Sequence, residues 1–163
     1  MNIRLHSKAP LLETLKWLNR FSLFRYAFDF IFDFSLARTA HVKHNDVKLH
    51  LSAPNQLVNY RIRTFSSKEP ETLSWIDQLQ SKDVLWDIGA NIGLYTCYAA
   101  SKGITVVAFE PSHLNIHTLV SNISLNKLSN LVTFVPLPLS NQSQIAKFNT
   151  RFTRIGSALS SFS

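Results

Sequence analysis

The stretch that decides the fold is DIGANIGLYT, residues 87–96, which follows an apolar run over 84–88 and opens a helical pattern over 94–101. Gly89 and Gly93 are four residues apart. That spacing matches neither the G-x-G-x-x-G fingerprint of dinucleotide sites nor the P-loop, which ends in Gly-Lys-Ser/Thr. What remains is a turn between a strand and a helix, a place where helix N-terminal amides face a ligand crevice.

The segments after this turn repeat the same rhythm. ITVVAF over 104–109 has the length and apolar content of a buried strand, and 131–135 begins a third strand. Between them Ser112 is the expected N-cap of a second helix, whose inner face would carry Ile116, Leu119, Val120 and Ile123. The fold class is therefore α/β, half of a Rossmann-like, doubly wound parallel sheet with right-handed crossovers and helices on both faces.

The N-terminal part follows different patterns, and we divide the chain into an extension over 1–70 and a sheet domain over 71–163. The extension contains a predicted helix over 11–38 and short strands over 47–51 and 57–65, and a helix over 71–80 opens the sheet domain. The helix over 11–38 is rich in aromatic residues. Packing on a core is the expected use of that segment, and peripheral contact with a membrane interface is the alternative.

Charge divides the chain in the same way. The formal net charge is +7, and residues 1–70 hold eleven Lys and Arg against five Asp and Glu. Such an excess attracts nucleic acid, anionic lipid or acidic substrates without specifying any of them, and a solvated basic surface is the simplest reading. A single cysteine, no signal-peptide pattern and no apolar run of about 18 residues lead us to expect a cytoplasmic protein.

Two carboxylates bracket the glycine turn. Glu110 ends the second strand, where an acidic side chain can accept both hydroxyl hydrogens of a ribose. Asp87 would repel a pyrophosphate but favours an ammonium or a nearby sulfonium, so S-adenosylmethionine fits better than a dinucleotide. The alternative is structural: Asp87 caps the turn and Glu110 caps the second helix.

VLWDIGANIGLYTCYAA followed by VVAFEPSHLNIHTLVSNISLN resembles the FkbM-type methyltransferases, a branch of the class I S-adenosylmethionine-dependent fold, most strongly over 69–140. The resemblance implies methyl transfer to a hydroxyl of a sugar, a glycan or a secondary metabolite. It implies a methionine-end site, a ribose site at Glu110 and an adenine site at Ser140 and Asn141. The residues implied for the methionine end are Asp87, Gly89, Asn91 and Gly93.

The sequence departs from that family near its end. Where the family continues past a GSSL-like stretch, this sequence reads GSALSSFS over 156–163 and stops. We therefore expect a partial sequence whose first sheet strand keeps an unpaired edge. The isolated chain is expected to bind the cofactor poorly and to lack methyl transfer activity. No catalytic base is assigned.

Two other functions are less compatible with the sequence. An NAD-dependent oxidoreductase could use the same half-fold, but Asp87 and the glycine spacing argue against it. A basic nucleic-acid or membrane-surface module could use the N-terminal region, but no RNA-binding motif accompanies its aromatic residues, so no nucleic-acid partner is expected. The histidines have no carboxylate or cysteine partners at suitable spacing, so no metal site is expected.

Overall fold

The computed structural model describes residues 9–18, 20–145, 147–149, 154–158 and 161–162. Contacts divide the chain into two compact units, Met1–Ala37 and Arg38–Ser163, which are described separately. This division differs from the expected boundary at residue 70. The reason is that the segment after Ala37 folds against the helices of the sheet.

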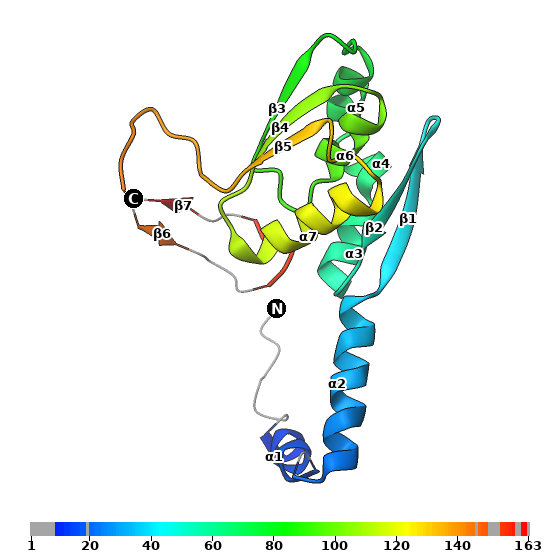
Figure 1. Ribbon diagram of the computed structural model, residues 1–163, viewed down its shortest axis with the longest axis vertical. Coiled ribbons are helices and arrows are strands. Elements are labelled where there is room, and N and C mark those ends of the chain that lie inside the picture. The colour runs from blue at the N-terminus through cyan, green and yellow to red at the C-terminus, as the bar shows by residue number, and fades with distance from the viewer. Residues whose placement is uncertain (1–8, 19, 146, 150–153, 159–160, 163) are drawn as a thin grey trace. The chain divides into compact units, whose positions relative to one another are not determined.

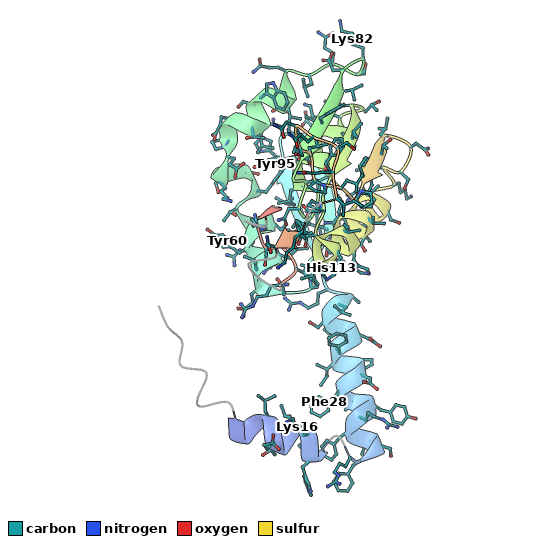
Figure 2. All side chains as sticks on the ribbon, turned by 90° about the vertical axis from the view of Figure 1, so that its left-hand side faces the viewer. Lys16, Phe28, Tyr60, Lys82, Tyr95 and His113 are labelled. Carbon is teal, nitrogen blue, oxygen red and sulfur yellow. The ribbon has the colours of Figure 1, made fainter. Side chains whose placement is uncertain are left out.

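The first unit holds two helices, α1 (Ala9–Leu18) and α2 (Ser22–Leu36), where one helix was predicted. Phe21 adopts an extended backbone (φ −92°, ψ 127°), which breaks the helix, and its ring lies 5.2 Å from that of Trp17. The predicted packing on a core is not seen among the described residues, because no residue of α2 is buried. Its phenylalanines, such as Phe28 in Figure 2, occur at every second position over 28–34, so they spread around the helix instead of forming one stripe.

The second unit contains the predicted parallel sheet. Its strand order is β3-β4-β5, with β3 at Val84–Ile88, β4 at Thr105–Phe109 and β5 at Val132–Val135. Helices α6 (Leu94–Ser101) and α7 (His113–Leu125) make the two crossovers (Figure 1). This arrangement confirms the α/β fold with a parallel, Rossmann-like half-sheet.

The described helices cover one face of this sheet. Val106 and Ala108 of β4 point into the core beneath α6 and α7 and are fully buried. Side chains of the other face of β3 are open: Val84, Trp86 and Ile88 are 56%, 59% and 64% exposed. Among the described strands β3 pairs with β4 alone, so it is an edge strand.

A hairpin and three helices precede the sheet. Strands β1 (Thr39–His44) and β2 (Val47–Ser52) pair antiparallel, followed by α3 (Gln56–Arg63), α4 (Phe65–Lys68) and α5 (Pro70–Asp77). The prediction of β2 and of the α5 helix is confirmed; the strand predicted over 57–65 is wrong. Asn55 caps a helix there, its Oδ1 accepting the Val58 N–H at 2.9 Å, and Val58 and Ile62 bury one helical face.

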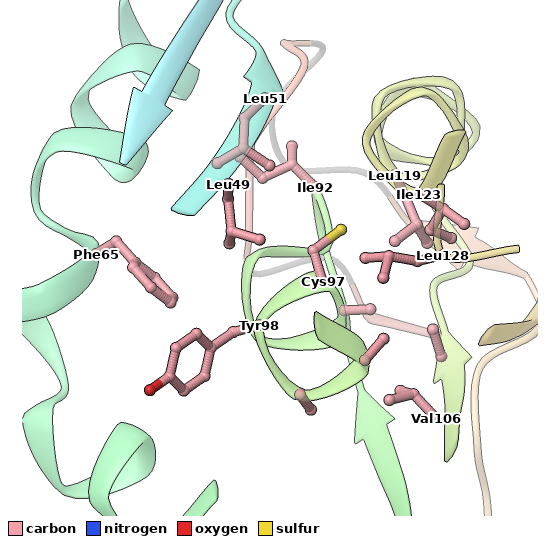
Figure 3. Close-up of a cluster of buried hydrophobic side chains, with 14 of the residues drawn as sticks. Leu49, Leu51, Phe65, Ile92, Cys97, Tyr98, Val106, Leu119, Ile123 and Leu128 are labelled. Carbon is pink, nitrogen blue, oxygen red and sulfur yellow. The ribbon is translucent and has the colours of Figure 1, made fainter. Parts of the chain in front are cut away.

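The core joins the hairpin to the sheet. Figure 3 shows Leu49 and Leu51 of β2 facing Cys97 and Tyr98 of α6, with side chains of α7 closing the other side. Burial raises the pKa of the Cys97 thiol to about 12, so this cysteine is an inert core residue. A short antiparallel pair, β6 (Phe148–Asn149) and β7 (Ser161–Phe162), completes the described strands.

The inner face of α7 is rotated from the predicted one. Leu119 and Ile123 are buried as predicted, but Val120 is 46% exposed. Three polar residues share the buried face instead: Asn115, Thr118 and Asn122. No helix in the described ranges combines the length and apolar content that crossing a bilayer requires.

Candidate functional site

The glycine turn after β3 is held by its neighbours. The N–H groups of Gly89 and Ala90 both donate to the carbonyl of Phe109 on β4, each at 2.9 Å. Gly89 and Gly93 have φ values of 80° and 78°, which glycine adopts without steric cost. A Cβ at Gly93 would lie 2.3 Å from Leu119 Cδ1, so this glycine also permits the close approach of α7.

Glu110 is the centre of a hydrogen-bond network. It is 5% exposed. Its Oε2 accepts the main-chain N–H of Asn91 at 2.7 Å, and its Oε1 accepts the Ser112 N–H at 2.9 Å and Asn115 Nδ2 at 3.3 Å. Ser112 is the N-cap of α7, as predicted, but its own side chain makes no capping bond. Glu110 therefore binds the start of α7 and the glycine turn at once.

Asp87 lies at the end of β3 and is partly buried. Its Oδ2 accepts the hydroxyl of Thr96 in the first turn of α6. Burial raises the pKa of this carboxyl, and the nearby Glu110 raises it further against the lowering effect of Thr96. The Asp87 side chain thus fixes the glycine turn to α6, in agreement with the structural alternative in which Asp87 caps the turn.

Two cavities meet at Pro111. The smaller, about 160 Å³, is lined by Gly89, Asn91, Glu110, Pro111, Asn115, Ser157 and Ala158. The larger, about 490 Å³, is lined by residues of the loop after β5, Ser140 among them, and by Pro111. Of the predicted site residues, the structure brings Gly89, Asn91 and Glu110 into one cavity and Ser140 into its neighbour.

The other predicted site residues lie apart from these linings. Asp87 and Gly93 support the turn from behind, and Asn141 lines neither cavity; its Oδ1 accepts the hydroxyl of its neighbour Ser140 at 3.4 Å. The described residues contain no grouping of three or more His, Cys, Asp or Glu that could hold a metal ion. The binding roles of all seven residues remain predictions.

A turn formed by Arg154–Ala158, here called the 154–158 turn, closes the smaller cavity. The Ser157 N–H donates to the Arg154 carbonyl at 3.1 Å, and Gly156 has φ 85°. The carbonyl of Ser157 accepts Nδ2 of Asn91 at 2.8 Å and of Asn115 at 3.1 Å. The Oδ1 of Asn91 is buried without a hydrogen-bond partner among the described residues, so this cavity wall offers a free acceptor.

Sequence reasoning missed Asn115 and the 154–158 turn. Asn115, Asn122 and Asn126 recur at intervals of seven and four residues, which places them on one stripe of α7 and its end. Polar residues in that pattern signal buried hydrogen bonding and could have been noticed. The 154–158 turn could not have been predicted as part of the site, because it lies far from Asn91 in sequence and no local pattern indicates their contact.

Two curated relatives that match part of the chain are both named as methyltransferases. No family model matches the sequence. The chain is 28% identical over 93 residues to the hexuronic acid methyltransferase AglP of Haloferax volcanii, covering 50% of this chain and 38% of that protein. It is 37% identical over 57 residues to a tRNA (guanine(37)-N(1))-methyltransferase of Schizosaccharomyces pombe, covering 35% of this chain and 13% of that protein. The chain thus spans well under half the length of either curated relative.

Solved structures give weaker likenesses. A putative transferase, PH0793, from Pyrococcus horikoshii matches 61% of this chain and 36% of its own with a TM-score of 0.43 and 19% identity. TYW2 of P. horikoshii in complex with MeSAdo matches the same shares of the two chains with a TM-score of 0.41 and 20% identity.

Proposed function

We propose that the chain is the cofactor-binding part of an S-adenosylmethionine-dependent methyltransferase of the FkbM type, which methylates a hydroxyl of a sugar, a glycan or a secondary metabolite. The observation that carries the proposal is Glu110. A buried carboxylate at the end of the second parallel strand, hydrogen-bonded to the glycine turn of the first, is the arrangement that receives a ribose in sheets of this kind.

The chemistry of the cavity suits this cofactor. The open space above Gly89, where a Cβ would meet no atom within 4 Å, leaves room for a ligand against the backbone. The unpartnered Oδ1 of Asn91 is an acceptor for a ligand donor such as an ammonium. In this proposal Gly89 and Asn91 hold the methionine end, Glu110 the ribose, and Ser140 in the adjoining cavity the adenine. Asp87 and Gly93 act by supporting the turn.

Size also bears on the proposal. The larger cavity, at about 490 Å³, falls within the roughly 300–1,000 Å³ typical of ligand sites, whereas the smaller one, at about 160 Å³, is below that range. Because both cavities are lined by Pro111 and the ribose residue Glu110 lines the smaller one, a nucleoside in this proposal extends across Pro111 into the larger cavity. This is the reason for assigning the ribose and the adenine to different sides of that residue.

S-adenosylmethionine supplies an electrophilic methyl group. The described residues of this chain would bind and orient it: the turn fixes one end, Glu110 the centre, and the loop after β5 the other end. Methyl transfer is an in-line displacement, so alignment of donor and acceptor is the main contribution of a protein. We assign no base for the acceptor proton.

Acidic sugars are the first acceptors to test. The relative from H. volcanii is named for hexuronic acid, which carries a carboxylate beside its hydroxyls. The relative from S. pombe is named for tRNA, but it matches over a shorter part of this chain. We therefore place a small-molecule or glycan acceptor first and treat tRNA as an outcome of the test.

The deciding experiment measures the thermal midpoint of the chain alone, with S-adenosylhomocysteine and with NAD. We expect S-adenosylhomocysteine, supplied in large excess, to raise the midpoint, since even weak binding to the folded state does so by mass action, and NAD at the same concentration to leave it unchanged. A second arm offers tritiated S-adenosylmethionine with a glucuronide or with tRNA. A shift with NAD alone, or with neither ligand, would reject the proposal; label in tRNA and not in the glucuronide would correct the acceptor class.

A further inference from the structure

Arg61 of α3 is docked onto the 154–158 turn. Its Nε donates to the carbonyl of Gly156 at 2.6 Å. One residue earlier in the turn, the Ile155 carbonyl accepts Asn55 Nδ2 at 3.1 Å. These two bonds join α3 and its N-cap to the turn, and the first holds the guanidinium group of Arg61 at the turn through Nε.

The rest of the guanidinium has no partner within the described ranges. The ion pairs there are Lys16–Glu13, Lys68–Glu69 and Lys102–Asp77, and the side chain of Arg61 makes no hydrogen bond to a described residue except the one from Nε. Arg61 is partly buried, so it has lost some of its hydration without gaining a carboxylate. Neither terminal amino group donates to an acceptor among the described residues, so both can donate to a ligand.

The 154–158 turn connects this guanidinium to the cavity. The carbonyl of Gly156 faces Arg61, and the next carbonyl, that of Ser157, faces Asn91 and Asn115. Arg61 does not itself line the cavity, but the residue it binds, Gly156, directly precedes Ser157 of the cavity wall. Arg61 and the exposed Arg154 are the two cations of this turn and its contacts, and of the two Arg61 is the one whose side chain is held by a hydrogen bond to the turn.

We infer that Arg61 binds the carboxylate of the methyl acceptor and so selects an acidic sugar over its neutral counterpart. The planar guanidinium fork matches a carboxylate and forms paired, charge-assisted hydrogen bonds. Anchored at Nε, it loses little further conformational freedom on binding. The inference rests on the proposed methyltransferase function and assigns that function's substrate class to one residue.

The test uses two sugars that differ only in the acidic group. Methyl β-D-glucuronoside and methyl β-D-glucoside are titrated into the full chain in the presence of S-adenosylhomocysteine, with saturation-transfer NMR as the readout. We expect the glucuronoside to bind about tenfold more tightly or better, as one charged hydrogen-bonded contact provides. Arg61→Gln should abolish this preference, and Arg63→Gln, an exposed arginine two residues along the same helix, should keep it.

Each outcome separates the inference from the function on which it rests. Binding of S-adenosylhomocysteine is measured in the same samples, and its absence from the wild-type chain rejects the proposed function and the inference together. If that ligand binds and the two sugars bind equally, or Arg61→Gln keeps the preference, then Arg61 only clamps the turn and the inference fails alone. Inorganic phosphate is titrated in parallel. If phosphate binds in an Arg61-dependent way and the glucuronoside does not bind, the carboxylate assignment is also overturned.

Discussion

Glu110 at the end of β4 accepts the main-chain N–H of Asn91 in the turn after β3, with 2.7 Å between Oε2 and N. Asn91 has φ 53°, in the left-handed region that asparagine enters more readily than most residues. The other oxygen of Glu110 accepts the first N–H of the α7 cap. One buried side chain thus sets the conformation of the glycine turn and the start of the next helix.

Glu110→Gln should destabilise the fold by about 1–3 kcal/mol, because its amide group would face a main-chain N–H and leave that buried donor unsatisfied. Urea unfolding measures the difference. Glu71→Gln, on an exposed position of α5, is the matched control and should change stability little. Equal stability of wild type and Glu110→Gln would show that the network does not hold the turn.

Gly89→Ala and Gly103→Ala form a matched pair. Both glycines have positive φ, 80° and 85°, and a Cβ at either meets no atom within 4 Å. Each substitution should therefore cost about 1–2 kcal/mol of backbone strain. Only Gly89 lines the cavity, so only Gly89→Ala should weaken S-adenosylhomocysteine binding, by about tenfold or more. Calorimetric titration of S-adenosylhomocysteine into both variants measures the difference. If both variants lose affinity equally, the ligand does not bind in the cavity lined by Gly89.

The sheet was predictable because its signals are local. Each of the three apolar runs between 84 and 135 has strand length, and the first two are followed by a helix with a recognisable glycine turn or capping residue. The helix α3 was missed for a local reason as well. LVNYRIRTF alternates apolar and polar residues like a strand, and asparagine, here the N-cap Asn55, is as typical of turns as of helix starts.

The closure of the site was not predictable from local patterns. Asn91 and Ser157 meet although 66 residues separate them, and Arg61 reaches Gly156 across 95 residues. The sequence near 156 mixes small and polar residues with isolated apolar ones such as Ile155, with no periodicity that assigns it a neighbour. Burial of Asn115 likewise depends on the rotation of α7 about its axis. The apolar residues of the helix alone predict a different rotation from the one observed.

Asp87 predicts a dependence of stability on pH. Its folded-state pKa is raised above the ordinary value of 3.8, chiefly by burial, so the folded state retains this proton at pH values where the unfolded chain has released it. The contribution of Asp87 is therefore complete below the unfolded pKa and declines as pH rises through the folded pKa. The stability of Asp87→Asn relative to wild type should increase with pH over that window.

Urea unfolding of wild type and Asp87→Asn at several pH values between that ordinary pKa and neutrality measures the trend. Asp46→Asn, in the exposed turn of the hairpin, is the control and should show a flat difference. A difference for Asp87→Asn that falls with pH would mean that interactions favouring the carboxylate outweigh its burial.

Asn122 of α7 links the β1–β2 hairpin to the glycine turn after β3 by hydrogen bonds. It is fully buried, its Oδ1 accepts the Ser52 N–H of β2 at 2.7 Å, and its Nδ2 donates to the Ile92 carbonyl in the glycine turn at 2.7 Å. Asn122→Ala leaves both main-chain groups without this partner, so we expect a loss of about 2–5 kcal/mol in unfolding free energy. Hydrogen exchange should accelerate at the Ser52 amide, whereas Ser124→Ala, exposed on the same helix, should change neither quantity. Unchanged exchange at Ser52 in Asn122→Ala would show that β2 is held by its apolar contacts alone.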